Sequence, residues 1–157
     1  MGAHRKNDSG LWAGVLLAYW DEGEEDWRVP LVIDYTYADP KLKSPGGRGK
    51  PGEGPDDTAT REMEEEAGPK VSLDELKLLI AMKKVDEATW DEHFWYLFKT
   101  IRDKRPNGMK KVGDEGEIVQ ELTRKQIREK IALREVLDTN IGPLTDFLDS
   151  LPERPSF

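Results

Sequence analysis

The residues best suited to chemistry in this chain are three glutamates, Glu62, Glu65 and Glu66, which lie close together in the sequence. At about 100° per residue, a helix would present all three within an arc of about 100°. Carboxylates gathered in this way repel one another unless a positive charge lies among them. A hard divalent cation with oxygen ligands is the obvious partner, so the spacing predicts a metal site on one side of a helix.

The segment 45–68 has the signals of a Gly/Pro-rich loop that leads into this helix. Gly54 fits the N-cap and Pro55 the first helical position, and two aspartates in the first turn complement the positive end of the helix dipole. Gly68 fits the left-handed residue that ends a helix. The side next to the glutamates is apolar and predicts docking on a core; it consists of Ala59, Met63 and Ala67.

Eight positions of this segment have a spacing that is specific to one family. They are Gly47, Glu53, Arg61, Glu62, Met63, Glu65, Glu66 and Gly68. The pattern resembles the Nudix box, the signature of the Nudix hydrolases, and chance would give it on the order of once in 10^5 such sequences. One position departs from the family: Pro69 stands where an aliphatic residue is usual, which affects the packing at the helix exit and leaves the acidic cluster intact.

The resemblance implies an activity and a cofactor. Nudix hydrolases cleave a nucleoside diphosphate linked to another moiety, and the negative oxygens of such a linkage repel an incoming nucleophile. Magnesium bound by carboxylates neutralises that charge and orients a water, and a further carboxylate can take the proton of the water. We therefore expect a Mg²⁺-dependent pyrophosphohydrolase acting on a small-molecule nucleotide or nucleotide conjugate, with Mn²⁺ as the alternative metal.

The resemblance also implies roles for residues of the box. Glu65 and Glu66 would be the principal metal ligands, and Glu62 a further ligand or the general base. The choice of base among the glutamates stays open, so Glu62 and Glu65 are both expected to act in catalysis. Glu53 and Arg61 would support catalysis by orienting the loop and the glutamates.

Four further residues are candidates outside the acidic helix. Gly46, matched to the glycine pair of the loop, would offer its carbonyl to the metal. A further acidic ligand in the family often comes from a later loop, and Glu115 is the first choice here, with Glu117 second. Arg48 and Lys50 lie in the same loop as Gly46 and could bind phosphate oxygens of the substrate.

Other interpretations of the acidic helix stay open. An acidic helical face is usually a solvated surface, and the joint spacing of the box is what argues against that here. A Nudix-fold binding or regulatory module without turnover is one rival, although such modules typically lack a glutamate of the box. A hydrolase of a non-nucleotide phosphate, such as an isoprenoid or inositol phosphate, is the other. The Asp/Asn ligand loop of a calcium-binding hand is absent.

Composition sets wider bounds. The chain has 157 residues with a formal net charge of −8 and no cysteine. The charge disfavours nucleic-acid polymers and anionic membranes as partners, and no apolar run is long enough to span a bilayer. The lack of cysteine fits a cytoplasmic protein. We expect a mobile N-terminus at 1–9, a single domain at 10–152 and a tail at 153–157; a homodimer stays open.

The order of the predicted elements favours one α/β domain. Strands are expected at 11–20, 28–37, 76–85, 92–102 and 117–122. Thr123 and Gln126 predict a capping box that opens a helix with an apolar stripe reaching Leu137, and a last amphipathic helix follows around 144–151. Such an order suits a mixed β-sheet between helices. The Nudix fold is an α/β/α sandwich of this kind, so the pattern and the resemblance agree.

The aromatic residues divide into two predicted groups. Trp12, Trp95 and Phe98 lie in apolar runs and are expected in the core. Four others flank turns and could line a nucleobase pocket: Trp20, Trp27, Tyr35 and Tyr37. His93 opens a strand and is expected to be structural.

Overall fold

The sheet of the computed structural model, which describes residues 10–157, is built around its first strand. The strands are β1 (Leu11–Asp21), β2 (Asp26–Ile33), β3 (Gly46–Arg48), β4 (Lys77–Val85), β5 (Glu92–Arg102) and β6 (Ile118–Thr123). The helices are α1 (Pro55–Glu66), α2 (Arg124–Ala132) and α3 (Asp138–Ser150), with a short 3₁₀ helix, η2, at Leu73–Glu75. The predicted mobile N-terminus at 1–9 lies outside the described residues.

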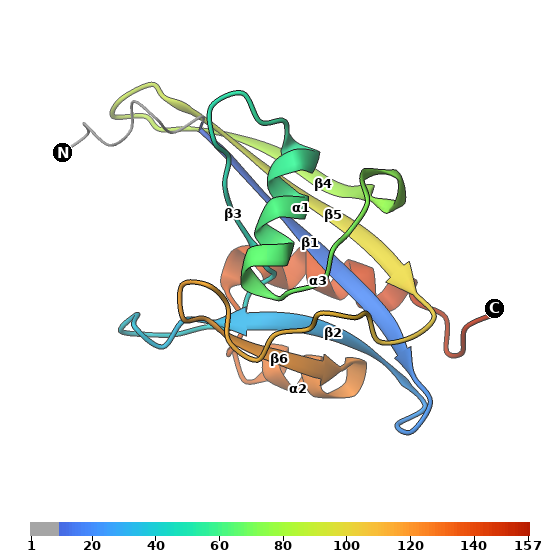
Figure 1. Ribbon diagram of the computed structural model, residues 1–157. Helices are drawn as coiled ribbons and strands as arrows, with labels where there is room; N and C mark the ends of the chain where they lie inside the picture. The colour runs from blue at the N-terminus through green and yellow to red at the C-terminus, as the bar shows by residue number, and fades with distance from the viewer. Residues whose placement is uncertain (1–9) are drawn as a thin grey trace.

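The strands form one mixed sheet in the order β4-β5-β1-β2-β6, and β3 pairs with β1 beside this path. β1 and β5 are parallel, and the other pairs are antiparallel. β1 is apolar along almost its whole length because helices cover it on both sides. Its central position makes it the support for both layers of the molecule (Figure 1).

Helices cover the two faces of the sheet, as the α/β/α prediction requires. On one face, Ala59 and Met63 of α1 pack with Val15 and Leu17 of β1. On the opposite face, the alternate residues of β1 share one large core cluster with side chains of α2 and α3, and this cluster includes Leu16, Ile127 and Phe147. Figure 1 shows α1 in front of the sheet and α3 behind it. The predicted sandwich is confirmed.

The sheet opens between β1 and β2, and this opening prepares the functional site. The two strands pair only near their hairpin, at residues 19–21 and 26–28, after which β2 pairs with β6. The short strand β3 takes the vacated place beside β1, where Gly46 lies opposite Gly14. Lys43, just before it, bridges to Val32 of β2. The loop that leads to α1 is thereby fixed to both sides of the opening.

Several element boundaries differ from the sequence predictions for local reasons. β2 ends at Ile33, not Tyr37, because the carboxylate of Asp34 accepts hydrogen bonds from the amide and hydroxyl of Thr36 and closes a turn. α2 ends at Ala132, and Arg134 with φ 58° interrupts the helical path, so Leu137 precedes α3 and does not extend the stripe of α2. In the described part of the chain, no helix has the length and apolar character needed to cross a membrane.

Candidate functional site

Helix α1 begins and ends where the sequence signals place it. Gly54 is the N-cap with extended backbone, Pro55 is the first helical residue, and Gly68 adopts φ +109° just after the helix. Gly68 donates its amide to the carbonyl of Met63 at 3.0 Å, which closes the helix end. With Met63 fully buried against β1, the glutamates on the neighbouring side of α1 face the opening beside β3.

Arg61 is the centre of an ion-pair network that ties the loop to the helix. Its Nε and Nη2 donate to the two carboxylate oxygens of Glu53 at 2.8 and 2.9 Å. The guanidinium lowers the pKa of Glu53 to about 2. Arg61 Nη2 also donates to the carbonyl of Arg48 at 2.9 Å, and Thr58 donates its hydroxyl to Glu53 at 3.0 Å. The loop and the first turns of α1 thus hold each other in one arrangement.

The same guanidinium contacts two of the three glutamates. Arg61 Nη1 lies 2.9 Å from Glu62 Oε1 and 3.2 Å from Glu65 Oε2. Glu62 is packed against the backbone of β3, because a Cβ atom on Gly47 would lie 2.5 Å from its carboxyl carbon. Only glycine at position 47 leaves room for that carboxylate where it lies. Burial raises the pKa of Glu62, and Arg61 opposes the increase.

Glu66 is the most deeply buried of the three, at 8% exposed. Its Oε1 accepts a 2.7 Å hydrogen bond from the amide of Gly46. Burial raises the pKa of Glu66 to about 8, with Lys43 and the Gly46 amide acting in the opposite direction. The residue is therefore a carboxylate whose charge the protein by itself stabilises poorly.

The loop after β5 brings two more glutamates to the C-terminal end of α1. It is anchored there by Lys110, whose amide donates to the carbonyl of Ala67 at 2.8 Å, and by Asp114, whose amide donates to the carbonyl of Glu65 at 3.0 Å. Glu117 is 5% exposed, and its Oε1 has no hydrogen-bond partner among the residues that the structure describes. Glu115 is exposed on the same loop.

These side chains line one polar cleft of about 600 Å³. The predicted residues Gly46, Arg48, Lys50, Arg61, Glu62, Glu65, Glu66 and Glu115 all line it, whereas Glu53 does not line it and contacts Arg61. Sequence reasoning missed Trp12, Asp34 and Lys43 as lining residues and ranked Glu117 second. Lys43 and Asp34 carry no motif in the sequence. They reach the cleft only because β2 and the following loop flank the opening in the sheet.

The donor set fits a hard divalent cation. An orphaned carboxylate oxygen on Glu117 and a buried carboxylate on Glu66 share the cleft with Glu62 and Glu65, and Mg²⁺ prefers oxygen ligands of this kind. Within residues 10–157, however, no three carboxylate or imidazole groups are already arranged around a common metal position. Arg61 contacts both Glu62 and Glu65, so a cation bound by these carboxylates would either share them with the guanidinium or displace it.

The prediction for Trp20 and Trp27 is wrong, and the prediction for Trp12 and Trp95 holds only in part, since both pack against the large core cluster. Trp20 and Trp27, expected near a base pocket, are buried and pack edge to face with ring centroids 5.5 Å apart. Trp12 and Trp95, expected in the core, are only partly buried and line a second cavity. Tyr37 lines the polar cleft. Turn proximity is a poor guide here because the segment after α3 covers Trp27, whose indole nitrogen donates to the carbonyl of Pro152 at 2.8 Å.

Comparison with known proteins gives a consistent family and fold. The NUDIX domain family matches residues 13–139 of the chain. A comparison with curated proteins finds no match.

Many solved structures share the fold at low identity. The MutT protein from Bacillus halodurans is 21% identical, with a TM-score of 0.63 over 92% of this chain and 84% of that one. The dihydroneopterin triphosphate pyrophosphohydrolase from E. coli is 15% identical, with a TM-score of 0.61 over 92% of this chain and 99% of that one. A MutT/nudix family protein from Enterococcus faecalis is 19% identical with a TM-score of 0.60; 72% of this chain matches it and spans 43% of its length.

Proposed function

The chain belongs to the Nudix hydrolase family, and from this premise we propose that it is a Mg²⁺-dependent pyrophosphohydrolase. Its substrate is a nucleoside diphosphate linked to another moiety, and water attacks one phosphorus of the linkage. The observation that carries the proposal is the convergence of Glu62, Glu65 and Glu66 with the unpartnered oxygen of Glu117 in one cleft. Mn²⁺ is the alternative metal for the same oxygen donors.

The residues that would hold the metal are Glu62, Glu65, Glu66 and the carbonyl of Gly46, with Glu117 as a further ligand in preference to Glu115. The preference rests on burial: a carboxylate oxygen without a partner costs free energy unless a cation or donor meets it, and Glu117 has such an oxygen while Glu115 is exposed. When bound, the metal neutralises phosphate charge and helps orient the attacking water.

The protein side chains supply the remaining functions. Glu62 or Glu65 accepts the proton of the attacking water at a carboxylate oxygen. Arg61 and Glu53 fix the position of these glutamates through their paired hydrogen bonds. Arg48 and Lys50 line the same cleft and are the proposed contacts for the phosphate oxygens of the substrate.

The test is hydrolysis of a panel of nucleotides and nucleotide conjugates with Mg²⁺, comparing the wild type with Glu65→Gln and Glu66→Gln. We expect release of a nucleoside monophosphate from at least one member and a loss of about 10²-fold or more in each variant. Glu64→Gln is the matched control, since Glu64 lies on the same helix but does not line the cleft.

Two results would overturn the proposal. If the wild type binds one member of the panel tightly and cleaves none, the chain is a binding module. If both variants retain full activity while cleavage proceeds, the site lies elsewhere. Cleavage of an isoprenoid or inositol phosphate in preference to every nucleotide would replace the substrate class and keep the site.

A further inference from the structure

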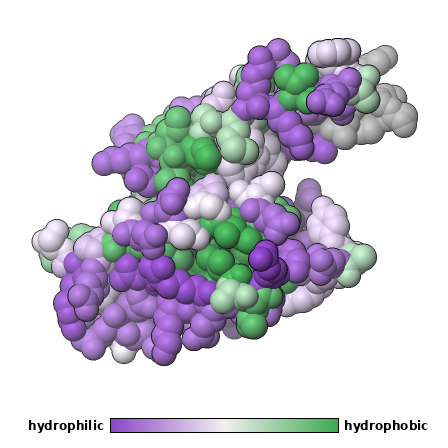
Figure 2. Space-filling model, turned by 180° about the vertical axis from the view of Figure 1, so that it is seen from behind, coloured by the Kyte–Doolittle hydropathy of each residue, from purple (hydrophilic) through white to green (hydrophobic). Residues whose placement is uncertain are grey.

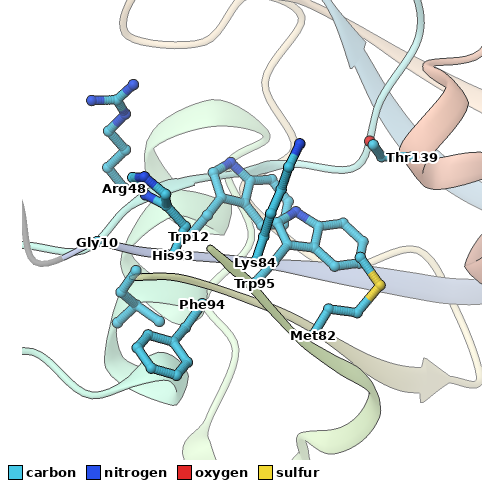
Figure 3. Close-up of a pocket in the computed structure, with 10 residues that line it drawn as sticks. Gly10, Trp12, Arg48, Met82, Lys84, His93, Phe94, Trp95 and Thr139 are labelled. Carbon is cyan, nitrogen blue, oxygen red and sulfur yellow. The ribbon is translucent and has the colours of Figure 1, made fainter. Parts of the chain in front are cut away.

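A second cavity, of about 400 Å³, adjoins the polar cleft. The two share Trp12 and Arg48 as lining residues, so a ligand whose phosphates lie in the cleft can extend into the cavity. We call it the indole pocket, because Trp12 and Trp95 form its centre. Thr139 at the start of α3 closes one side (Figure 3).

The indole pocket exists because α3 covers only part of its face of the sheet. Strand pairing places Met82, Trp95, Trp12 and Arg48 in one row across β4, β5, β1 and β3. Side chains of this row project on the same face as the core under α3, and Trp12 and Trp95 pack against the edge of that core. Met82 remains 45% exposed. Figure 2 shows hydrophobic surface on both sides of a hollow on this face.

The two indoles are held in a defined geometry. Their ring centroids lie 5.2 Å apart with an interplanar angle of 17°, which is an offset stack. The six-membered ring of Trp12 lies against backbone glycines: a Cβ on Gly46 would be 2.5 Å from the Trp12 ring, and one on Gly14 would be 2.8 Å from it. The positions of the indoles are therefore set before any ligand binds.

The chemistry of the lining favours a planar aromatic group with a negatively charged neighbour. Indole rings and a thioether form an apolar, polarisable surface on which aromatic rings stack well. Arg48, Lys84 and His93 bring basic groups to the rim, and no aspartate or glutamate lines the pocket among residues 10–157. In Figure 3 the side chain of Lys84 extends alongside the rings, while Phe94 points away from them.

We propose that the indole pocket binds the base of the nucleotide substrate by stacking on Trp95 and Trp12, with two-ring purines bound more tightly than single-ring pyrimidines. The preference follows from contact area, since a larger ring covers more of the indole and thioether surface. The inference rests on the proposed function and deepens it by naming the base as the part of the substrate that the protein recognises. An inositol phosphate has no apolar face for this surface.

The test measures binding of GMP, AMP, UMP and ribose 5-phosphate by calorimetry in EDTA, so that neither metal nor turnover enters. We expect purine monophosphates to bind more tightly than UMP, and ribose 5-phosphate to bind weakest. Trp95→Leu should weaken purine binding by about 5- to 100-fold and leave ribose 5-phosphate unchanged. Trp95→Phe should restore most of the affinity because it keeps an aromatic face.

Two variants guard against effects on folding. Met82→Ala removes an exposed side chain of the pocket and should weaken purine binding several-fold without lowering the melting temperature. Trp90→Leu alters an indole that is 78% exposed and does not line the pocket, and it should bind purines as the wild type does.

The experiments distinguish a failure of the proposed base pocket from a failure of the proposed hydrolysis. The inference is overturned if ribose 5-phosphate binds as tightly as GMP, or if Trp95→Leu and Met82→Ala leave purine affinity unchanged; hydrolysis with Mg²⁺ can persist in either case. If purine binding depends on Trp95 but no nucleotide is cleaved with Mg²⁺, the proposed hydrolysis fails and the base pocket stands.

Discussion

At the scale of single residues, Glu66 sets the character of the site. Its carboxylate is almost fully buried and receives one hydrogen bond, from the Gly46 amide. Burial raises its pKa to about 8 from an ordinary value of 4.5, so at neutral pH the fold tolerates a group that would be more stable uncharged. In the proposed function this carboxylate meets a cation, and we expect folding stability to be reduced until it does.

The first prediction concerns Glu66→Gln in EDTA. Because the pKa of the acid is raised in the folded state, the folded state binds more protons than the unfolded state between pH 4.5 and 8, and stability falls as pH rises through that window. The substituted side-chain amide can still accept the hydrogen bond from Gly46 and carries no charge, so we expect the variant to be more stable at pH 8.5 by about 1–3 kcal/mol and equal to the wild type near pH 4. Thermal unfolding across this range is the measurement; a less stable variant at pH 8.5 would contradict it.

The second prediction separates positioning from binding at Arg61. Glu53→Gln removes a charge from the paired hydrogen bonds, and Arg61→Lys removes the planar fork that makes them. Each should lower kcat by about 10–100-fold with a smaller change in KM, because neither Glu53 nor the fork contacts the reacting phosphate. Steady-state kinetics with a substrate found in the panel checks this. Full activity in Arg61→Lys would show that a positive charge at position 61 is enough to position the glutamates, without the planar fork.

The sequence predicted those residues of the site that belong to one local motif. Glu62, Glu65 and Glu66 lie on one helix, so their shared direction follows from sequence spacing, and all three line the cleft. Lys43 reaches the cleft from a distant segment, and nothing local marks it. Glu117 was ranked behind Glu115 because its burial depends on the packing of its loop against α1, which the sequence pattern does not contain. The tryptophans were misassigned because exposure in a strand depends on which neighbouring element covers it, and the incomplete cover by α3 is a tertiary property.

At the scale of elements, β3 and α1 act as one unit. β3 has three residues, two of them glycines. A segment this short and this rich in glycine carries no strand pattern, so the sequence does not predict it as a strand. Its pairing with β1 places Gly46 under Trp12 and Gly47 under Glu62. Two adjacent glycines therefore serve two different sites, the indole pocket and the polar cleft.

The third prediction compares alanine at these two glycines. A Cβ on Gly46 would meet the backbone carbonyl of Ala13 at 2.8 Å as well as the Trp12 ring, whereas a Cβ on Gly47 would meet only the flexible end of Glu62 within the closest contacts. We expect Gly46→Ala to destabilise the fold by about 1–3 kcal/mol and Gly47→Ala to fold nearly normally but lose hydrolysis. Thermal unfolding and the nucleotide assay distinguish them. Equal losses of stability would show that Glu62 cannot move aside.

The fourth prediction concerns η2 and the end of β5. Arg102 lies 2.8 Å from Glu75 and lowers the pKa of that carboxyl from 4.5 to about 2. A lowered pKa contributes stability that is present above pH 4.5 and is lost as pH falls toward 2. Glu75→Gln should lower the free energy of unfolding by about 1–2 kcal/mol at pH 7, after allowance for solvent screening. The difference in stability between the variant and the wild type should disappear as pH falls from 4.5 toward 2. Asp74→Asn, an exposed neighbour, is the control and should follow the wild type at every pH.

At the scale of the whole molecule, the topology explains why the sequence predicts the layers better than their arrangement. Strand and helix positions follow from local periodicity, and the predicted strand at 92–102 agrees with β5. The parallel pairing of β1 with β5 joins segments far apart in the chain, and the opening between β1 and β2 is occupied by β3, which pairs with the distant β1. Local sequence signals do not predict these long-range pairings, yet the pairings together create the polar cleft and the adjoining indole pocket.

The last prediction follows from the electrostatics of the entire chain. The net charge is −8, and a cation that binds only the folded state stabilises it by mass action, about 2.7 kcal/mol at 100 times the dissociation constant. Mg²⁺ should therefore raise the melting temperature of the wild type by about 5–10 °C at saturation. NaCl at matched ionic strength screens charge generally and should give a smaller increase. Glu117→Gln should reduce the Mg²⁺ effect and Glu64→Gln should preserve it; an equal increase with NaCl, or an unaltered effect in Glu117→Gln, would argue against a specific site at this cluster.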